Sequence, residues 1–212
     1  MLENIIYSKR FPDKKNRNLL WKTLIKNFLQ EFFDTKDVVL DVGCGYGEFI
    51  NNISCYKKYA LDINSDVAKF LNKDVFFLKS FSSKISIKNK IIDKIFISNF
   101  FEHITKDEII KTIQELKRIL KPDGKIIILQ PNIRFCGKNY WMFFDHITPI
   151  DDRALIEAFE TLGFKVNLNI EKFLPFTTKN NLPQHPVFLY IYLKLPFLWK
   201  IFGAQSLLIF NL

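Results

Sequence analysis

Apolar residues recur along this chain with the two periods that distinguish helices from strands. Residues 18–33 carry leucine, isoleucine and aromatic side chains at helical spacing, which predicts an amphipathic helix ahead of the first strand. Short apolar runs bounded by polar residues then predict strands at 38–42, 59–63, 75–78, 94–98 and 125–129. We expect helices between these strands, and the first of them should begin around 49–53.

The segment 106–120 is the clearest helix prediction. Thr105 and Glu108 form the pattern of a capping box, and apolar residues follow at helical spacing. The helix should end at Lys121-Pro122-Asp123-Gly124, because proline and glycine favour a turn. Farther on, 152–162 predicts a helix stopped by Gly163, followed by strands at 164–170 and 206–212.

The order of these elements predicts the fold class. Strands that alternate with helices indicate βαβ units and therefore a mostly parallel sheet. The last two strands have no regular crossover helix between them, which favours an antiparallel C-terminal edge. The prediction is an α/β fold in one domain, with helices on both faces of the sheet, and 212 residues are enough to bury its core.

Composition narrows the choice of partners. The net charge of +9 comes mostly from lysine, whereas nucleic-acid readers depend on the bidentate fork of arginine, so nucleic-acid binding is disfavoured. Attraction to an anionic substrate or membrane surface fits the charge better. Cys44, Cys55 and Cys136 form no CxxC pair, and the sequence predicts neither a disulfide framework nor a metal site. The N-terminus lacks the features of a signal peptide, so we expect a cytoplasmic protein.

A glycine-rich loop follows the first predicted strand. Gly43, Gly45 and Gly47 allow the backbone to approach a ligand closely at a helix N-terminus. A dinucleotide-binding loop needs a further glycine at position 48, which is Glu48 here. The carboxylates of Asp41 and Glu48 also oppose a pyrophosphate and favour a cationic ligand. The ammonium and sulfonium of S-adenosylmethionine meet that requirement.

Asp62 ends the second predicted strand, where a carboxylate can accept both ribose hydroxyls of an adenosine. A helix cap or a solvated loop acid is the alternative. At this point the chain resembles the class I S-adenosylmethionine-dependent methyltransferases, and among them small bacterial members associated with cell-surface glycan or lipid modification. The resemblance covers about residues 36–165. It rests on four ordered stretches: VLDVGCGYGEF (39–49), YALDIN (59–64), DKIFISNFFEHI (93–104) and LKPDGKIIILQPN (120–132).

The resemblance implies a Rossmann-like, seven-stranded sheet and S-adenosylmethionine as cofactor. It divides the chain into an N-terminal lid and helix (1–35), a cofactor-binding core (36–170), and an apolar insertion with the last strand (171–212). These enzymes often bind the adenine amino group with an acid after strand three, but this chain has Ser80 there, so Ser80 or a backbone carbonyl must replace it. The implied cofactor-binding residues are Asp41, Gly43, Gly45 and Gly47 around the methionine moiety, Asp62 at the ribose, Ile63 and Ser80 at the adenine, and Asn99 at the methionine moiety.

Three histidines are candidates for the base that an oxygen acceptor requires. His103 follows the fourth strand, close to where the resemblance places the methyl group, and it fits a structural role in that loop equally well. His146 lies in an aromatic-rich loop after the fifth strand, at the sheet edge where ligands bind in open α/β folds. Asp145 beside it is placed to orient the ring. His185 lies between prolines and is expected to be a loop residue.

Residues 186–202 are apolar on nearly all sides but too short and too interrupted for a transmembrane helix. Four roles are consistent with this segment: a cover over the acceptor pocket, a dimer interface, a peripheral contact with a membrane, or packing in the hydrophobic core. Tyr7 and Arg10 precede the first helix, where related enzymes place a lid over the cofactor; a frayed terminus is the alternative.

We therefore expect a methyltransferase acting on a small molecule, with an oxygen of a sugar, or of a nucleotide- or lipid-linked surface-modification precursor, as acceptor. Methylation of protein or RNA is an alternative, although Ser98-Asn99-Phe100-Phe101 lacks the Asn/Asp-Pro-Pro-Tyr/Phe motif of adenine- and glutamine-directed enzymes. A NAD-binding oxidoreductase and a non-catalytic cofactor-binding module are further alternatives. The oligomeric state stays open.

Overall fold

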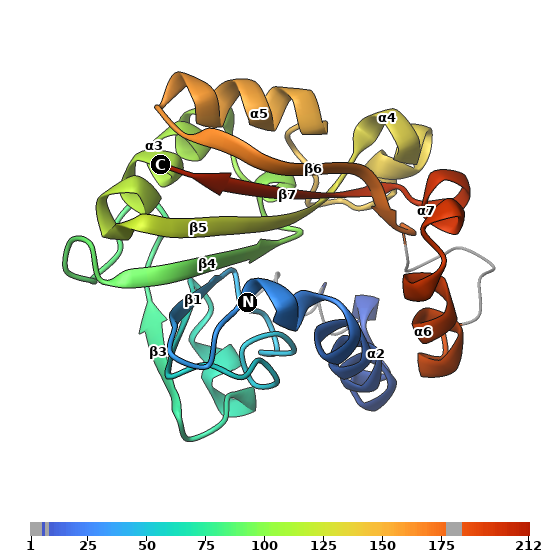
Figure 1. The fold of residues 1–212 in the computed structure, drawn as a ribbon, viewed down its shortest axis with the longest axis horizontal. Helices are drawn as coiled ribbons and strands as arrows, with labels where there is room; N and C mark the ends of the chain where they lie inside the picture. The colour runs from blue at the N-terminus through green and yellow to red at the C-terminus, as the bar shows by residue number, and fades with distance from the viewer. Residues whose placement is uncertain (1–5, 7–8, 177–183) are drawn as a thin grey trace.

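A seven-stranded sheet forms the centre of the molecule (Figure 1). The computed structural model describes residues 6, 9–176 and 184–212. The strand order is β3-β2-β1-β4-β5-β7-β6, and β7 runs antiparallel to both of its neighbours. The strands are β1 (Val38–Val42), β2 (Lys57–Asp62), β3 (Val75–Lys79), β4 (Ile92–Ser98), β5 (Leu120–Pro131), β6 (Lys165–Leu174) and β7 (Gln205–Asn211). The predicted fold class is confirmed.

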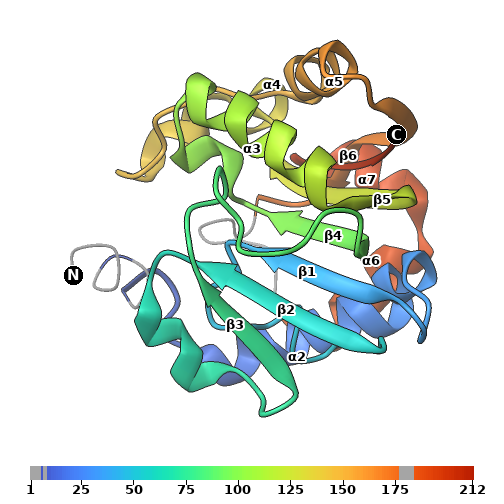
Figure 2. The same ribbon diagram turned by 90° about the vertical axis from the view of Figure 1, so that its left-hand side faces the viewer.

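Helices cover both faces of this sheet (Figures 1 and 2). On one face α3 (Lys106–Ile119) and α5 (Asp152–Thr161) bury a core that includes Ile113 and Phe159. On the other face α2 (Lys14–Asn27) packs beside α6, and the core there includes Leu24 and Leu193. The remaining helices are α4 (Ile133–Cys136), α6 (Pro186–Lys194) and α7 (Pro196–Phe202), with 3₁₀ turns η1 (Leu29–Phe32), η2 (Ser65–Phe70), η3 (Phe101–His103) and η4 (Gly137–Met142).

The two helices with the strongest sequence signals form as predicted. Thr105 caps α3, because its side chain accepts a hydrogen bond from the backbone N–H of Glu108 at 3.3 Å. Asp151 caps α5 in the same way. Gly163 follows α5 with a φ of +84°, a left-handed conformation that favours glycine and ends the helix.

Two local predictions are wrong. Residues 49–52 form turns instead of a helix. The N–H groups of Asn51 and Ile53 bond to the carbonyls of Gly47 and Phe49 as in a helix, but these bonds extend over only one turn. Residues 121–124 belong to β5 and do not form a separate turn. The ladder between β4 and β5 shifts from Ile92–Leu120 to Lys94–Lys125, so this segment bulges out of a continuous strand.

The apolar segment 186–202 forms α6 and α7, which pack against the end of β6 and against α2. The hydroxyl of Tyr192 donates to the carbonyl of Phe173, and the indole N–H of Trp199 donates to the carbonyl of Tyr192. These bonds satisfy the polar ends of two aromatic side chains that are otherwise packed in the core. Within the described residues, no helix combines the length and the apolar character needed to cross a bilayer.

Candidate functional site

The glycine loop turns at the carboxyl end of β1. Gly43, Gly45 and Gly47 have φ values of +70°, +51° and +73°, which glycine adopts without strain. The N–H of Gly43 donates to the carbonyl of Leu61 at 2.9 Å, which holds the loop against the end of β2. A Cβ at Gly43 would lie 2.6 Å from the ring of Phe100, so packing also requires glycine at this position.

Three carboxylates surround this loop. Asp41 is 3% exposed, and its pKa is raised well above the usual range by burial and by the negative charges of Glu48 and Asp62. The Asp62 carboxylate accepts from the N–H groups of Gly45 and Asn64, at 3.2 and 2.9 Å. Arg17 of α2 pairs with Glu48 at 2.5 Å. The loop is therefore lined by carboxyl groups, one of which, Glu48, is paired with Arg17.

The predicted adenine end lies on the surface. Ile63 follows β2 and is 47% exposed, and Phe81 follows β3 and is 68% exposed. Between them Ser80 begins the loop after β3, where its N–H donates to the carbonyl of Asp62 and its hydroxyl donates to the carbonyl of Lys84. These apolar faces are available to a flat ligand.

Asn99 occupies a strained position directly after β4. Its φ of +48° is unusual for a residue other than glycine. Its N–H donates to the carbonyl of Leu129 at 2.9 Å, and its side-chain amide donates to the hydroxyl of Ser98. The strained backbone brings Asn99 to the wall of two neighbouring cavities.

Glu102, His103 and His146 form a buried polar cluster next to the loop. Glu102 and His103 belong to η3, and His146 comes from the loop before α5. The segments are tied together, because the N–H groups of Ile147 and Thr148 both donate to the carbonyl of Glu102. The two imidazole rings meet edge to face, with centroids 5.0 Å apart.

Asp145 contacts other partners than those predicted. Its carboxylate pairs with Arg10 at 2.5 Å and lies 3.5 Å from Nδ1 of His103, so it orients His103 and not His146. Burial alone would raise the pKa of Asp145. The hydrogen bond from Arg10 and the charges of His103 and Arg10 outweigh burial and hold the pKa below its usual range.

Burial controls the protonation of the other two members of the cluster. It lowers the pKa of His146 to about 4, helped by the positive charge of His103, so His146 is neutral at physiological pH. It raises the pKa of Glu102 above its usual value, even though His103 and a hydrogen bond from Gln130 oppose the shift.

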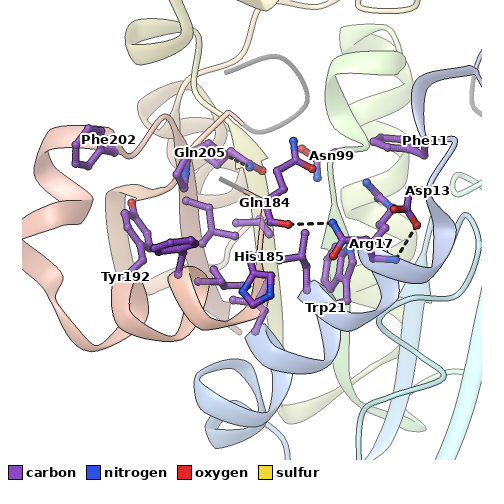
Figure 3. Close-up of a pocket in the computed structure, with 18 of the residues that line it drawn as sticks. Phe11, Asp13, Arg17, Trp21, Asn99, Gln184, His185, Tyr192, Phe202 and Gln205 are labelled. Carbon is purple, nitrogen blue, oxygen red and sulfur yellow. Dashed lines mark hydrogen bonds between the residues drawn. The ribbon is translucent and has the colours of Figure 1, made fainter. Parts of the chain in front are cut away.

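Two adjoining cavities extend from this site. The smaller, of about 120 Å³, touches the glycine loop and the histidine cluster. The larger, of about 640 Å³, lies between α2, the ends of the central strands and helices α6 and α7 (Figure 3). Its lining is mostly apolar and includes Trp21, Tyr192 and Phe202. Residues shared by the two cavities are Arg10, Phe11, Arg17, Trp21 and Asn99.

Sequence reasoning missed two charged residues of this site. Arg17 reads as a helix-surface residue, and only the tertiary structure brings it to Glu48. Glu102 had a signal that could have found it, because an acid that follows two phenylalanines shortly after a buried strand is out of place unless it has a function. His185 caps α6 through Nδ1, in line with a structural role. Tyr7, a predicted lid residue, lies outside the described residues.

Comparisons with known proteins agree with the geometry. Residues 14–168 match a family model described as a methyltransferase domain. The chain is 30% identical over 161 residues to an uncharacterized protein of Methanocaldococcus jannaschii. The aligned region covers 75% of this chain and 69% of that protein.

Solved structures with similar folds cover almost the whole chain. One is a SAM-dependent methyltransferase from Archaeoglobus fulgidus, with a TM-score of 0.68, 24% identity and 98% of each chain covered. Another is a protein of Haloferax volcanii solved in complex with the Trm112 methyltransferase activator. Its TM-score is 0.68 at 15% identity, with 97% of this chain and 96% of that chain covered.

Proposed function

Because the chain belongs to the methyltransferase family, we propose that it methylates a small-molecule acceptor with S-adenosylmethionine as its cofactor. Bound S-adenosylmethionine supplies a methyl group on a sulfonium, a carbon already activated for transfer. The protein has to bind the cofactor, align the acceptor and manage at most one proton.

The residues around the glycine loop fit this cofactor. Asp41, Glu48 and Asp62 gather negative charge that suits the ammonium and sulfonium groups and repels a pyrophosphate, which argues against NAD. Main-chain N–H groups hold the Asp62 carboxylate at the end of β2, in position to accept from ribose hydroxyls. Ile63 and Phe81 offer apolar surface for an adenine beside Ser80.

The larger cavity supports an acceptor with an apolar portion. It adjoins the smaller cavity at Asn99 and Trp21, so a molecule held between α2 and α6 reaches the histidine cluster. An oxygen of a sugar or of a lipid-linked precursor fits this arrangement, with the apolar part in the larger cavity. This adjacency is the single observation that carries the proposed acceptor class.

His103 and His146 are the candidates for handling the acceptor proton. Both line the smaller cavity. His146 is neutral at physiological pH and therefore able to accept a proton. His103 is held by the carbonyl and carboxylate of Asp145, which makes Asp145 its positioning residue.

The outer surface of α6 and α7 supports contact with a membrane surface. Apolar side chains are exposed there and Lys194 and Lys200 accompany them, as in helices that lie at a lipid interface. The exposed apolar residues outside the lining of the larger cavity are Val187, Tyr190, Leu195, Phe197 and Ile201, whereas Phe188, Ile191 and Phe202 line that cavity. Such contact would deliver a lipid-linked acceptor to the cavity that the same helices line.

Methyl transfer from labelled cofactor into a fractionated cell extract tests the proposal. We expect label in the small-molecule or lipid fraction when the purified full chain is added. Asp62→Ala should weaken binding of the cofactor by about 1.5–3 kcal/mol in calorimetry, because charge-assisted hydrogen bonds are lost, and the labelling should fall with it. Asp66→Ala, on the exposed turn after β2, is the matched control.

Three other results would each change a different part of the proposal. Label in the protein or RNA fraction would overturn the acceptor class and leave the methyltransferase in place. Tight cofactor binding with no labelled fraction would favour a non-catalytic module. Binding of NAD in preference to S-adenosylmethionine would overturn the cofactor assignment.

A further inference from the structure

The carboxylate of Glu102 points at the gap between two imidazole rings. Its Oε1 atom lies 3.7 Å from Nε2 of His103 and 3.9 Å from Nε2 of His146. The donor atoms of the three residues all lie within 4.8 Å of one another. These distances are too long for hydrogen bonds and leave a small space in the middle of the cluster.

Two polar atoms of this cluster are buried without a partner. Glu102 is 1% exposed, and its Oε1 accepts no hydrogen bond in the described part of the chain. Nδ1 of His146, a residue that is 7% exposed, is also without a partner, but it is not the ring nitrogen that lies beside Glu102. Buried polar groups normally have partners, so the orphaned Oε1 of Glu102, which lies near Nε2 of both histidines, indicates that something else belongs there.

Neighbouring residues fix the ligand atoms in place. Nδ1 of His103 lies 3.0 Å from the carbonyl oxygen of Asp145, and because a carbonyl only accepts, Nδ1 carries the proton. With the proton on Nδ1, the lone pair of Nε2 lies on the side of Glu102, 3.7 Å from its Oε1. Gln130 donates to the other carboxylate oxygen of Glu102 at 2.7 Å. Such outer contacts are typical of histidines and carboxylates that bind metals.

From this geometry we propose that Glu102, His103 and His146 bind a divalent transition-metal ion such as Zn²⁺ or Mn²⁺. Two imidazoles and one carboxylate are a donor set that these ions prefer. With the ion about 2.1 Å from each donor, neighbouring donors lie about 3–3.5 Å apart. The two distances from Glu102, 3.7 and 3.9 Å, are already close to that spacing, and donor atoms as far apart as 4.8 Å reach it by side-chain movements of about 1 Å.

The site would leave coordination positions open toward the smaller cavity. All three residues line that cavity together with Asn99 and the glycine loop. An ion there would use the lone pairs with which His103 and His146 would otherwise accept the acceptor proton. It would instead hold the acceptor hydroxyl and lower its pKa, as catalytic metal ions do. This role rests on the proposed function, whereas binding of the ion does not depend on it.

Metal binding by the full chain, without cofactor or acceptor, tests the proposal. The protein is stripped with a chelator and titrated with Zn²⁺ and Mn²⁺ in a calorimeter, and with Co²⁺ while its visible absorption is recorded. We expect one site per chain. Glu102→Gln and His146→Ala should each lower the affinity roughly 10- to 100-fold or more and should change or abolish the Co²⁺ spectrum.

Matched variants separate this site from adventitious binding. Glu108→Gln changes an exposed acid of α3, and His185→Ala removes the histidine outside the cluster. Both should bind the ions as the unchanged protein does. Glu102→Gln keeps the size of the side chain and removes a buried charge, so it should stay folded, which thermal unfolding verifies.

Either of two results would overturn the proposal. One is that the unchanged protein binds none of the tested ions more tightly than the Glu102→Gln variant does. The other is binding that disappears in His185→Ala and survives in His146→Ala. Because no methyl transfer is measured, failure here leaves the proposed function standing, and failure of the labelling experiment leaves the metal site standing.

Discussion

Asp41 is subject to two opposite requirements at the carboxyl end of β1. Its burial and its neighbours Glu48 and Asp62 raise its pKa, so an ionised Asp41 destabilises the protein without a ligand. In the proposed function the same charge favours binding of a cationic cofactor. Stability and binding therefore oppose each other at a single carboxyl group, as is common at functional sites.

This conflict predicts the effect of Asp41→Asn. The pKa of Asp41 in the folded protein lies above its value in the unfolded chain, which is about 3.9. At pH values between these two pKa values the folded protein binds one proton more than the unfolded chain, so the free energy of unfolding falls as pH rises. It falls by up to about 1.4 kcal/mol per pH unit, and Asp41→Asn should not show this fall. Asp41→Asn should therefore unfold at higher denaturant concentration than the unchanged protein at pH 8, with a smaller difference at pH 4.

Cofactor affinity provides the second measurement for Asp41→Asn. Calorimetry should show weaker binding of S-adenosylmethionine at pH 8, where the unchanged protein offers the most negative charge. Equal stability of both proteins at pH 4 and pH 8 would show that the carboxyl group has an ordinary pKa and would remove the conflict.

At the residue scale, the sequence predicts what local patterns encode. The glycines, Asp41 and Asp62 follow from the turn after a buried strand, and the structure places them together. The partner of Asp145 was predicted wrongly, because chain adjacency to His146 says nothing about where a side chain points. Arg17 and Glu48 are far apart in sequence, so only tertiary packing reveals their pair.

At the element scale, the histidine cluster lies next to the start of α3. The N-cap of α3, Thr105, is two residues after His103, the last residue of η3, which also carries Glu102. The hydroxyl of Thr148 in the facing loop donates to the carbonyl of Ile104 at 2.6 Å. The start of the helix therefore fixes the position of the cluster.

Thr105→Ala tests this connection. Loss of the cap should lower the free energy of unfolding by about 0.5–2 kcal/mol, because the backbone N–H of Glu108 loses its acceptor. Denaturant unfolding measures the change. Thr105→Ser keeps a capping hydroxyl and should stay within a few tenths of a kcal/mol of the unchanged protein. An equal loss in both variants would assign the effect to packing of the methyl group.

Elements with two agreeing signals were predicted best. For α3 a cap and a helical apolar period coincide, and the helix forms within one residue of the prediction. For 49–53 the apolar residues were the single signal for a helix, and the segment forms only turns. The Pro122-Gly124 signal was interpreted as a turn, and strand pairing on both sides converts it into a bulge.

At the scale of the whole molecule, α6 and α7 join the larger cavity to an exposed apolar surface. The double variant Phe197→Ser, Ile201→Ser should weaken binding to vesicles of mixed zwitterionic and anionic phospholipids, because apolar area and its insertion are lost. Vesicle sedimentation measures the bound fraction. Higher salt should also weaken binding, since Lys194 and Lys200 act through screened charge.

Phe144→Ser is the control for vesicle binding. Phe144 is the most exposed aromatic residue of the loop that precedes α5, on a different part of the chain. A membrane role for α6 and α7 would be contradicted if Phe144→Ser lowered vesicle binding as much as the double variant does. It would also be contradicted if the double variant bound vesicles as well as the unchanged protein.

A ribosome delivers β6 well before β7, yet β6 joins the sheet through β7 alone in the described part of the chain. Until residues 205–211 emerge, β6 has nothing to pair with and the apolar flank of β5 stays uncovered. β7 follows the other six described strands in the chain and completes this sheet. Until it pairs, the nascent protein has an open sheet edge, a state in which chaperones protect a chain from aggregation.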